Sequence, residues 1–216
     1  MKPRLSNRKT AAMTLMEVLV IIAVLAVVVA VLLPAIATTK KRSSKIGCVN
    51  DLKQIGLAFR IWSGDNGDKY PMEVSVTNGG AMELAALGNA AAVFQVMSNE
   101  LSTPKLLICP KDAKRSYATN FSGAFSATNI SYFVGLDANM ISQQAFHSGD
   151  RNIVGGIMKN GVLEITTNHP VGWSSELHGG AGNILTADGS VQAVSNSGLT
   201  NLIQQTGLAT NRLAIP

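Results

Sequence analysis

The chain has 216 residues, of which 46% are hydrophobic and 14% charged, and its formal net charge is +5. The length fits one compact domain, or one domain with an appendage, and the composition excludes an intrinsically disordered chain. Two basic clusters of +4 each, residues 1–12 and 40–45, flank an apolar run, whereas residues 46–216 carry a net −2. No large basic face is expected for a nucleic-acid backbone, so nucleic acid is not an expected partner.

The apolar run covers residues 18–37, which hold no charge and no polar face. A helix of twenty residues spans about 30 Å, the thickness of a bilayer core. A cleaved secretory signal, the alternative, has a shorter apolar region followed by a small-residue cleavage site. The sequence therefore predicts a transmembrane helix, whose orientation the two basic clusters leave open.

Glu17 stands at the edge of this run, where a carboxylate in lipid needs a partner or a function. The stretch Ala12-Met13-Thr14-Leu15-Met16-Glu17 resembles the type IV pilin-like family, which includes the pseudopilins of type II secretion. In that family a basic leader ends in a small residue, usually glycine, and a cleavage point follows. The cleavage point is followed by an aromatic residue or methionine, then Thr-Leu, one residue of any type, Glu and an apolar run. Here Ala12 replaces the usual glycine and Met13 the usual phenylalanine.

The resemblance implies that residues 1–12 are a cytoplasmic leader and that prepilin peptidase cuts between Ala12 and Met13. Met13 would then become the N-methylated terminus, and the head would lie in the periplasm. Glu17 would pair with the terminal amine of a neighbouring subunit; the alternative is that it only reaches the lipid headgroups. Pro34 falls where family members often carry a helix-kinking proline, so Glu17 and Pro34 are the expected assembly residues.

The helical pattern continues beyond the second basic cluster. Apolar residues recur there at spacings of three or four and line one face: Ile46, Val49, Leu52, Ile55, Phe59 and Trp62. We expect one helix over residues 13–63, from about residue 14 onward, which Pro34 kinks or locally melts. Its lower half would lie in lipid or a filament core, and its upper half would pack on a globular head.

A dense turn signal at residues 63–71 ends the helix. Oxygen-bearing side chains in this turn raise the possibility of a calcium site: Asp65, Asn66 and Asp68. The glutamate that an EF-hand requires is missing, so a capping turn is favoured. Residues 64–216 are expected to form an α+β head with a small antiparallel sheet. The predicted elements are an alanine-rich helix at 81–98 and strands at 130–136, 152–158, 161–166, 183–187 and 190–194.

Two tight turns are predicted between these strands. Residues 159–161 join the second strand to the third. Asp188-Gly189 joins the last two strands as a type I′ turn, because Asp-Gly between alternating runs is a strong hairpin signal. His178 precedes this turn by nine residues. That spacing resembles a His-x9-Asp-Gly signature in the C-terminal domain of a pilin-like subgroup from planctomycete- and verrucomicrobia-type bacteria. Residues 48–58 and 149–153 also resemble that subgroup.

The head is not expected to be catalytic. Its histidines lack the HxH or HxxxH spacing of a metal site, and its serines lack a nucleophile elbow. We therefore expect no catalytic residue, metal or cofactor, and we interpret His178 and Asp188 as a hydrogen-bonded clamp between loop and turn. Cys48 and Cys109 would lie outside the cytoplasm, where a disulfide is permitted; two separate buried thiols are the alternative.

These observations together predict a pilin-like α+β fold in which a long N-terminal helix packs on a small antiparallel sheet. The expected function is a structural subunit of a type IV pilus-like or type II secretion pseudopilus filament. It would be a single-pass inner-membrane protein, with prepilin peptidase and other pilin-like subunits as partners. The alternatives are a non-polymerising single-pass envelope protein with a ligand-binding head and a membrane-anchored hydrolase that uses His178.

Overall fold

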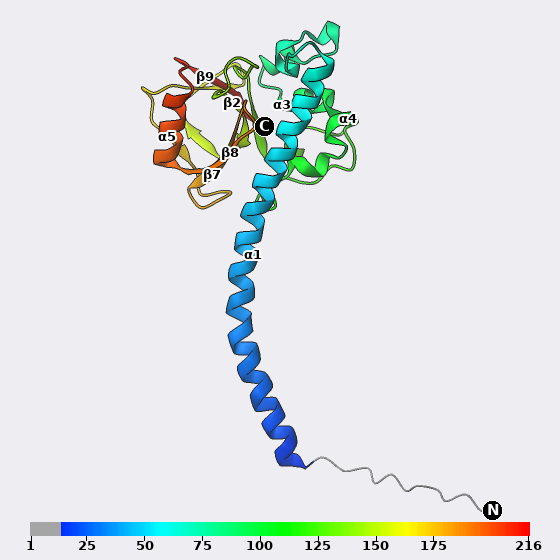
Figure 1. Ribbon diagram of the computed structural model, residues 1–216, viewed down its shortest axis with the longest axis vertical. Helices are drawn as coiled ribbons and strands as arrows, with labels where there is room; N and C mark the ends of the chain where they lie inside the picture. The colour runs from blue at the N-terminus through cyan, green and yellow to red at the C-terminus, as the bar shows by residue number, and fades with distance from the viewer. Residues whose placement is uncertain (1–13) are drawn as a thin grey trace, which may run out of the picture. The chain divides into compact units, whose positions relative to one another are not determined.

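The computed structural model describes residues 14–216, with the backbone alone for residues 33–44 (Figure 1). The leader and the expected cleavage site, Ala12 and Met13, lie outside the described residues. Helix α1 extends from Leu15 to Asp65, close to the predicted bounds. Its backbone stays helical through Pro34, so local melting at this proline is not observed. The chain divides after Ser43, and we call the compact part from Ser44 to Pro216 the head unit.

The head unit joins the last part of α1 to short helices and antiparallel sheets. The helices are α2 (Met82–Ala85), α3 (Ala90–Val96), α4 (Ser98–Leu101) and α5 (Asn196–Gln205). The seven-stranded sheet has the order β4-β5-β9-β1-β2-β7-β8, and β3 pairs with β6. The strands are β1 (Tyr132–Gly135), β2 (Phe146–Asp150), β3 (Ile153–Gly155), β4 (Ile157–Lys159), β5 (Val162–Ile165), β6 (Val171–Trp173), β7 (Ala181–Thr186), β8 (Val191–Ser195) and β9 (Asn211–Ala214). The chain is therefore α+β, with an apolar N-terminal helix and a C-terminal antiparallel sheet.

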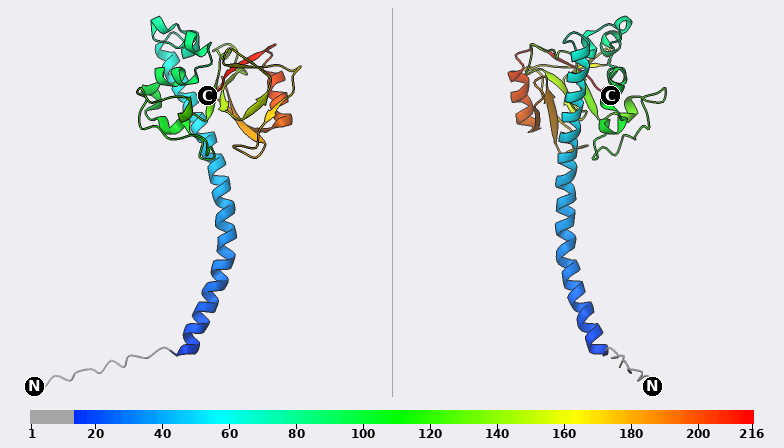
Figure 2. Two further views of the ribbon diagram at one scale, coloured as in Figure 1. Left: turned by 180° about the vertical axis from the view of Figure 1, so that it is seen from behind. Right: turned by 45° about the vertical axis from the view of Figure 1, so that its right-hand side comes forward.

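Strands β1 and β2 inside the seven-stranded sheet are buried on both faces, since alternate side chains along a strand point to opposite sides. The edge strands β4 and β8 are largely exposed. Tyr132 and Val134 of β1 join the core cluster that holds the last part of α1, whereas Phe133 joins a second cluster with α5. In Figures 1 and 2 the sheet accordingly lies between α5 and the last part of α1. Gly56 allows α1 to approach the sheet closely, since a Cβ there would lie 3.0 Å from a methyl group of Leu185.

The predicted apolar face of α1 is confirmed in its later turns and wrong at its start. Leu52, Ile55 and Phe59 are fully buried, and Trp62 is nearly so. Ile46 is instead 56% exposed, and the residue that enters the core at this end is Cys48. The prediction included Ile46 because it counted only the apolar residues at spacings of three or four. Cys48, a half-cystine buried in the core, was not counted as part of this face.

The predicted helix at residues 81–98 is divided into α2, α3 and α4. Helix α2 ends at Ala85, and Gly88 has φ +80° in the turn that follows. Asn89 then caps α3 by accepting a hydrogen bond from the amide of Ala92 at 3.1 Å. Alanine-rich composition favours helix overall, but a glycine followed by an N-cap residue starts a new helix.

The predicted strands are found, with one division and one different turn. Residues 152–158 form β3 and β4 in separate sheets, because Gly155 and Gly156 both have positive φ. The turn between β4 and β5 is a two-residue turn with positive φ at Asn160 and Gly161. The Asp188-Gly189 hairpin joins β7 to β8 as predicted, but only Gly189 has positive φ. The loop is a three-residue turn with a glycine bulge, so the type I′ prediction is wrong.

Replacement of Gly88 by alanine is expected to destabilise the head unit by about 2–4 kcal/mol. The new Cβ would collide with the carbonyl oxygen of Gly161, and φ +80° would strain the backbone. Gly79→Ala is the matched control, because Gly79 has φ +85° with nothing near its Cβ position. That variant should lose only about 1 kcal/mol, and equal losses in urea unfolding would contradict the collision.

Candidate functional site

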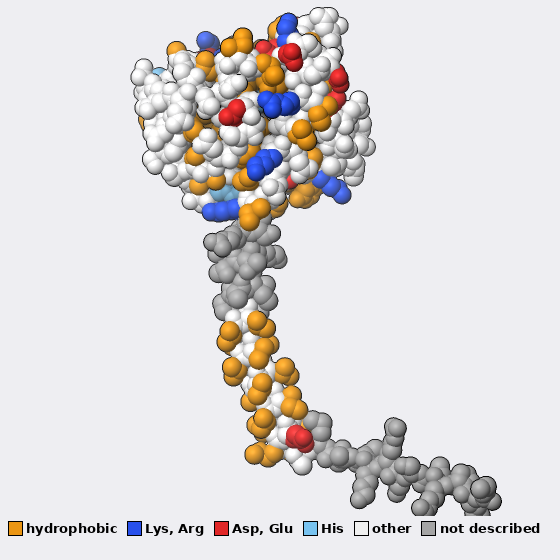
Figure 3. Space-filling model, viewed as in Figure 1, with side chains coloured by type: hydrophobic (Ala, Val, Ile, Leu, Met, Phe, Trp, Pro, Cys, Tyr) orange, Lys and Arg blue, Asp and Glu red, His pale blue; other side chains and the backbone are white. Residues whose placement is uncertain are grey.

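The N-terminal helix carries the first candidate site, which is an exposed apolar surface. Its stretch Leu15–Leu32 has a mean hydropathy of 3.2 and is not buried within the structure. Figure 3 shows hydrophobic side chains along the visible face of this stretch. It is long and apolar enough to cross a membrane, as predicted from residues 18–37.

Thr14 and Glu17 form a reciprocal cap at the start of α1. The amide of Glu17 donates to Thr14 Oγ1 at 3.3 Å, and the amide of Thr14 donates to Glu17 Oε2 at 3.4 Å. This is a capping box, and the Thr-x-x-Glu spacing that signals it is visible in the sequence. Sequence reasoning assigned Glu17 an assembly role and missed this local one.

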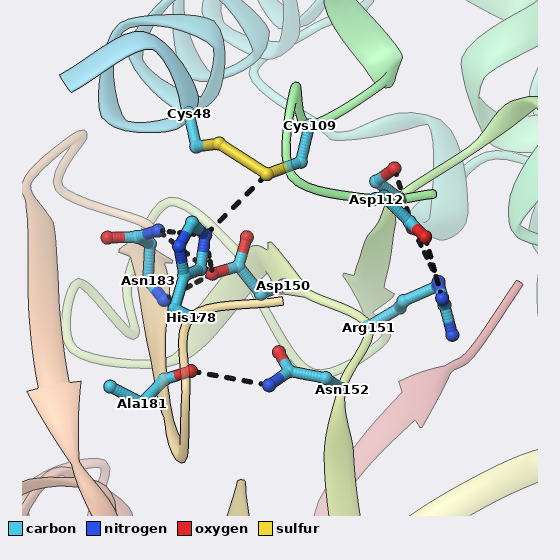
Figure 4. The surroundings of a disulfide bond; sticks show 10 residues. Cys48, Cys109, Asp112, Asp150, Arg151, Asn152, His178, Ala181 and Asn183 are labelled. Atoms are coloured by element: carbon cyan, nitrogen blue, oxygen red, sulfur yellow. Dashed lines mark hydrogen bonds and ion pairs between the residues drawn. A yellow bond between two sulfur atoms is a disulfide. The ribbon is translucent and has the colours of Figure 1, made fainter. Parts of the chain in front are cut away.

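The head unit contains a second candidate site around the disulfide between Cys48 and Cys109 (Figure 4). Cys48 belongs to α1, and Cys109 follows a 3-10 helix at Pro104–Leu107. Their Cα atoms are 5.3 Å apart, and both residues are fully buried. The bridge therefore ties the long helix to a segment 61 residues further along the chain.

His178, in the loop between β6 and β7, points toward this disulfide in Figure 4. Its Nε2 lies 3.6 Å from Cys109 Sγ, 3.2 Å from Asp150 Oδ2 and 3.3 Å from Asn183 Nδ2. Asp150 Oδ2 also accepts hydrogen bonds from the backbone amide and side-chain amide of Asn183, at 2.7 and 2.8 Å. These five residues, Cys48, Cys109, Asp150, His178 and Asn183, are called the disulfide cluster below.

The expected clamp between His178 and Asp188 is wrong. His178 is paired with Asp150 from the end of β2, whereas Asp188 accepts hydrogen bonds from Thr186 Oγ1 and the amide of Ser190 within its own hairpin. Burial raises the pKa of Asp188, but these hydrogen bonds outweigh it and leave the pKa below its ordinary value. Asp188 and Gly189 therefore shape the turn, and the carboxylate partner of His178 comes from a strand that the sequence did not reveal.

The cluster does not have the geometry of a nucleophilic triad. The same nitrogen of His178, Nε2, faces both Cys109 Sγ and Asp150 Oδ2, whereas a proton relay needs the two ring nitrogens to face different groups. Cys109 Sγ is also covalently bonded to Cys48. The arrangement can hold segments together, but in the disulfide form it has no free nucleophile.

The turn after β2 brings further polar residues to the same region. Arg151 donates from Nε and a terminal nitrogen to the two carboxylate oxygens of Asp112, at 2.7 and 2.8 Å. Burial raises the pKa of Asp112, but hydrogen bonds from Arg151 and Ser131 outweigh it and leave the pKa below its usual range. Asn152 donates to the carbonyl oxygens of Ser174 and Ala181. Residues 150–152 thus hold the segment around Asp112 and the loop between β6 and β7, a role that sequence reasoning did not assign.

A cavity of about 410 Å³ lies beside the disulfide cluster. Its wall on α1 includes Ile46 and Val49, and its other wall includes His178 and Ala193. The surface is mainly apolar, with lysine side chains at its edge: Lys45 and Lys53. This shape and chemistry suit a small apolar group better than a polar one.

His147 occupies a different buried place. Its ring lies 4.0 Å from that of Phe59 and 4.2 Å from that of Tyr70, measured between centroids. Burial lowers the pKa of His147 to about 3, and its Nε2 has no hydrogen-bond partner among the described residues. His147 is therefore neutral in the folded head unit at physiological pH. Burial has the opposite effect on an acid, and it raises the pKa of Asp51 on α1 to about 6.

Comparison of the chain with protein-family models, curated proteins and solved structures finds no match.

Proposed function

We propose that this chain is a pilin-like precursor whose product is a structural subunit of a type IV pilus-like or type II secretion pseudopilus filament. One observation carries the proposal: the prepilin-type motif from Ala12 to Glu17 leads directly into an apolar helical stretch, Leu15–Leu32, that none of the described residues buries. Such a surface needs an apolar partner. A bilayer provides one before assembly, and a bundle of equivalent helices provides one afterwards.

The motif supplies the order of events. Prepilin peptidase removes residues 1–12 on the cytoplasmic side of the inner membrane and methylates Met13. The head unit remains in the periplasm until the helix moves from lipid into a filament. There Glu17 neutralises the terminal amine of a neighbouring subunit and fixes the axial register of the two helices. The role is structural, with no catalytic step of the chain's own.

Intact-mass spectrometry of the protein from its native membrane tests the processing step. The expected mass is that of residues 13–216 plus one methyl group. An uncleaved Met1 terminus would contradict the proposal. Cleavage at another position, without methylation, would support a secretory signal instead.

Replacement of Glu17 by alanine or by glutamine is expected to abolish incorporation into filaments while leaving the protein in the membrane. Glutamine keeps the hydrogen bond of the capping box and removes only the charge, so it separates the two roles of this side chain. Subunit content of sheared filaments, measured by immunoblot against total membrane protein, gives the readout.

Thr14→Ala is the matched control, because it removes the cap from the other side and keeps the carboxylate. It should assemble and should lower helix stability by about 1 kcal/mol. If Glu17→Gln assembled normally while Thr14→Ala failed, the cap rather than the charge would be the assembly feature.

The cavity beside His178 favours a second candidate function, a non-polymerising envelope protein whose head binds a small apolar ligand. The two candidates differ in whether copies touch through the N-terminal helix. Cysteine substitutions at Leu19 and Leu25 should give cross-linked ladders in native membranes if the chain polymerises. Monomers alone would favour the ligand-binding alternative.

A further inference from the structure

The disulfide cluster places the donor atoms of three side chains together, and the carboxylate of a fourth residue, Asp150, contacts one of them. The ligand atoms of Cys48, Cys109 and His178 all lie within 4.8 Å of one another. Asp150 Oδ2 lies 3.2 Å from the same nitrogen of His178 that faces Cys109. Figure 4 shows these side chains converging from α1, from the segment after the 3-10 helix, from β2 and from the loop before β7.

Two of the distances between these donor atoms match edges of a tetrahedral zinc site. With Zn–S near 2.3 Å and Zn–N and Zn–O near 2.0–2.1 Å, the sulfur-to-nitrogen edge is about 3.6 Å and the nitrogen-to-oxygen edge about 3.3 Å. The corresponding distances here are 3.6 Å and 3.2 Å. Asp150 lies outside the group of donor atoms that are all within 4.8 Å of one another, so its side chain would have to move toward the sulfur atoms. The two sulfur atoms are too close, because they are bonded. Rotation of the two cysteine side chains after reduction would open that edge.

The carboxylate of Asp150 provides an independent observation. Asp150 is fully buried, and its Oδ1 has no hydrogen-bond partner among the described residues. Buried carboxylate oxygens are normally paired, so an unpaired one marks a place where a cation or donor is missing. His178 is held by the same carboxylate with its side chain 3% exposed. The cluster is thus a buried set of donor atoms in which Oδ2 of Asp150 is bonded to its neighbours and Oδ1 is an unpaired acceptor.

We propose that, once the disulfide is reduced, Cys48, Cys109 and His178 bind a zinc ion with Asp150 as the fourth ligand. Reduction by a phosphine and water forms two thiols and a phosphine oxide, and zinc then displaces the two thiol protons. Two thiolates, one neutral imidazole and one carboxylate complete the tetrahedron. Disulfide and zinc are mutually exclusive links between the same two segments, so zinc holds α1 to residue 109 when the covalent bond is absent. The site is independent of filament assembly.

Zinc titration of the full-length chain in detergent tests the site. The reduced protein, prepared with a water-soluble phosphine under argon, should bind one zinc ion per chain, and the oxidised protein should bind none. Cobalt(II) in place of zinc should give the intense visible bands of tetrahedral coordination together with thiolate charge-transfer absorption. Zinc should also protect both thiols from alkylation.

His178→Gln and Asp150→Asn separate a four-ligand site from a simple pair of thiols. His178→Gln should weaken zinc binding by about 100-fold or more, since even residues behind the ligands contribute 10- to 100-fold. His169→Gln is the matched control, because His169 is exposed and bonded to Thr166 Oγ1. Asp150→Asn keeps the side-chain shape and should change the cobalt spectrum.

Each outcome decides the proposal. Zinc affinity that is unchanged in His178→Gln would overturn it, as would failure of the folded, reduced protein to bind zinc. If reduction disorders the head unit, zinc should restore its near-ultraviolet circular dichroism. Failure to restore that signal would also overturn the proposal.

Discussion

Replacement of Arg151 by alanine is expected to destabilise the head unit by about 3–5 kcal/mol. The variant leaves the Asp112 carboxylate in the interior, where its side chain is 1% exposed, without the guanidinium that contacts both of its oxygens. A hydrogen bond from Ser131 remains, but it cannot replace a full positive charge. Urea unfolding followed by tryptophan fluorescence measures the loss, since Trp62 and Trp173 both lie in the head unit.

Arg212→Ala supplies the matched control for this prediction. Arg212 also contacts an aspartate, Asp137, but its side chain is 52% exposed. An exposed pair of this kind contributes about 1 kcal/mol or less. Removal of both partners of the buried pair, as Asp112→Leu with Arg151→Met, should destabilise less than Arg151→Ala alone. Equal losses in the two arginine variants would show that burial of the carboxylate is not the cause.

Lowering the pH from 7 to 4.5 is expected to destabilise the wild-type head unit relative to His147→Phe by about 2–3 kcal/mol. The folded pKa of His147 is lowered to about 3, whereas an ordinary histidine has 6.5. The unfolded chain therefore binds more protons between these values, and the folded state loses stability as the pH falls through that window. Below pH 3 the histidine is charged in both states, and the loss reaches its limit.

The comparison with His147→Phe isolates this histidine from other groups. Asp51, with its pKa raised to about 6, acts with the opposite sign, because its folded form binds a proton more readily than the unfolded chain. That effect is present in both proteins and cancels in the difference. His169→Gln, at an exposed position, should follow the wild-type pH profile. Parallel profiles for wild type and His147→Phe would contradict the assignment of the acid sensitivity to His147.

The parts of the fold that depend on local patterns could be predicted from the sequence. The long helix, the two hairpins and the apolar N-terminal stretch all follow from periodicity or turn residues. Strand β2 was missed because Phe146–Asp150 is buried along its whole length and contains His147, Ser148 and Asp150. Its polar side chains pair with distant groups, so neither alternation nor an apolar run reveals it.

The sequence identified only some residues of the candidate site, and it did not predict which of them are in contact. His178 stood out by its spacing from Asp188-Gly189, yet its carboxylate partner comes from β2, which the sheet places beside β7. A nine-residue spacing describes a loop and a turn, and it holds no information on which neighbouring strand supplies the acid. The position of Cys109 near Cys48 likewise depends on how residues 66–108 fold around α1.

The disulfide between Cys48 and Cys109 also determines how the chain responds to pulling. When α1 is pulled on the N-terminal side of Cys48 and the opposing force acts beyond Cys109, the force is transmitted from Cys48 through the disulfide to the backbone of Cys109. The segment between them carries no load, so the contacts of Leu52, Ile55 and Phe59 are shielded from mechanical unfolding. Reduction would transfer the full force to those apolar contacts. For a force applied between α1 and the C-terminus, the bridge therefore bypasses residues 49–108, whereas residues 110–216 remain under load.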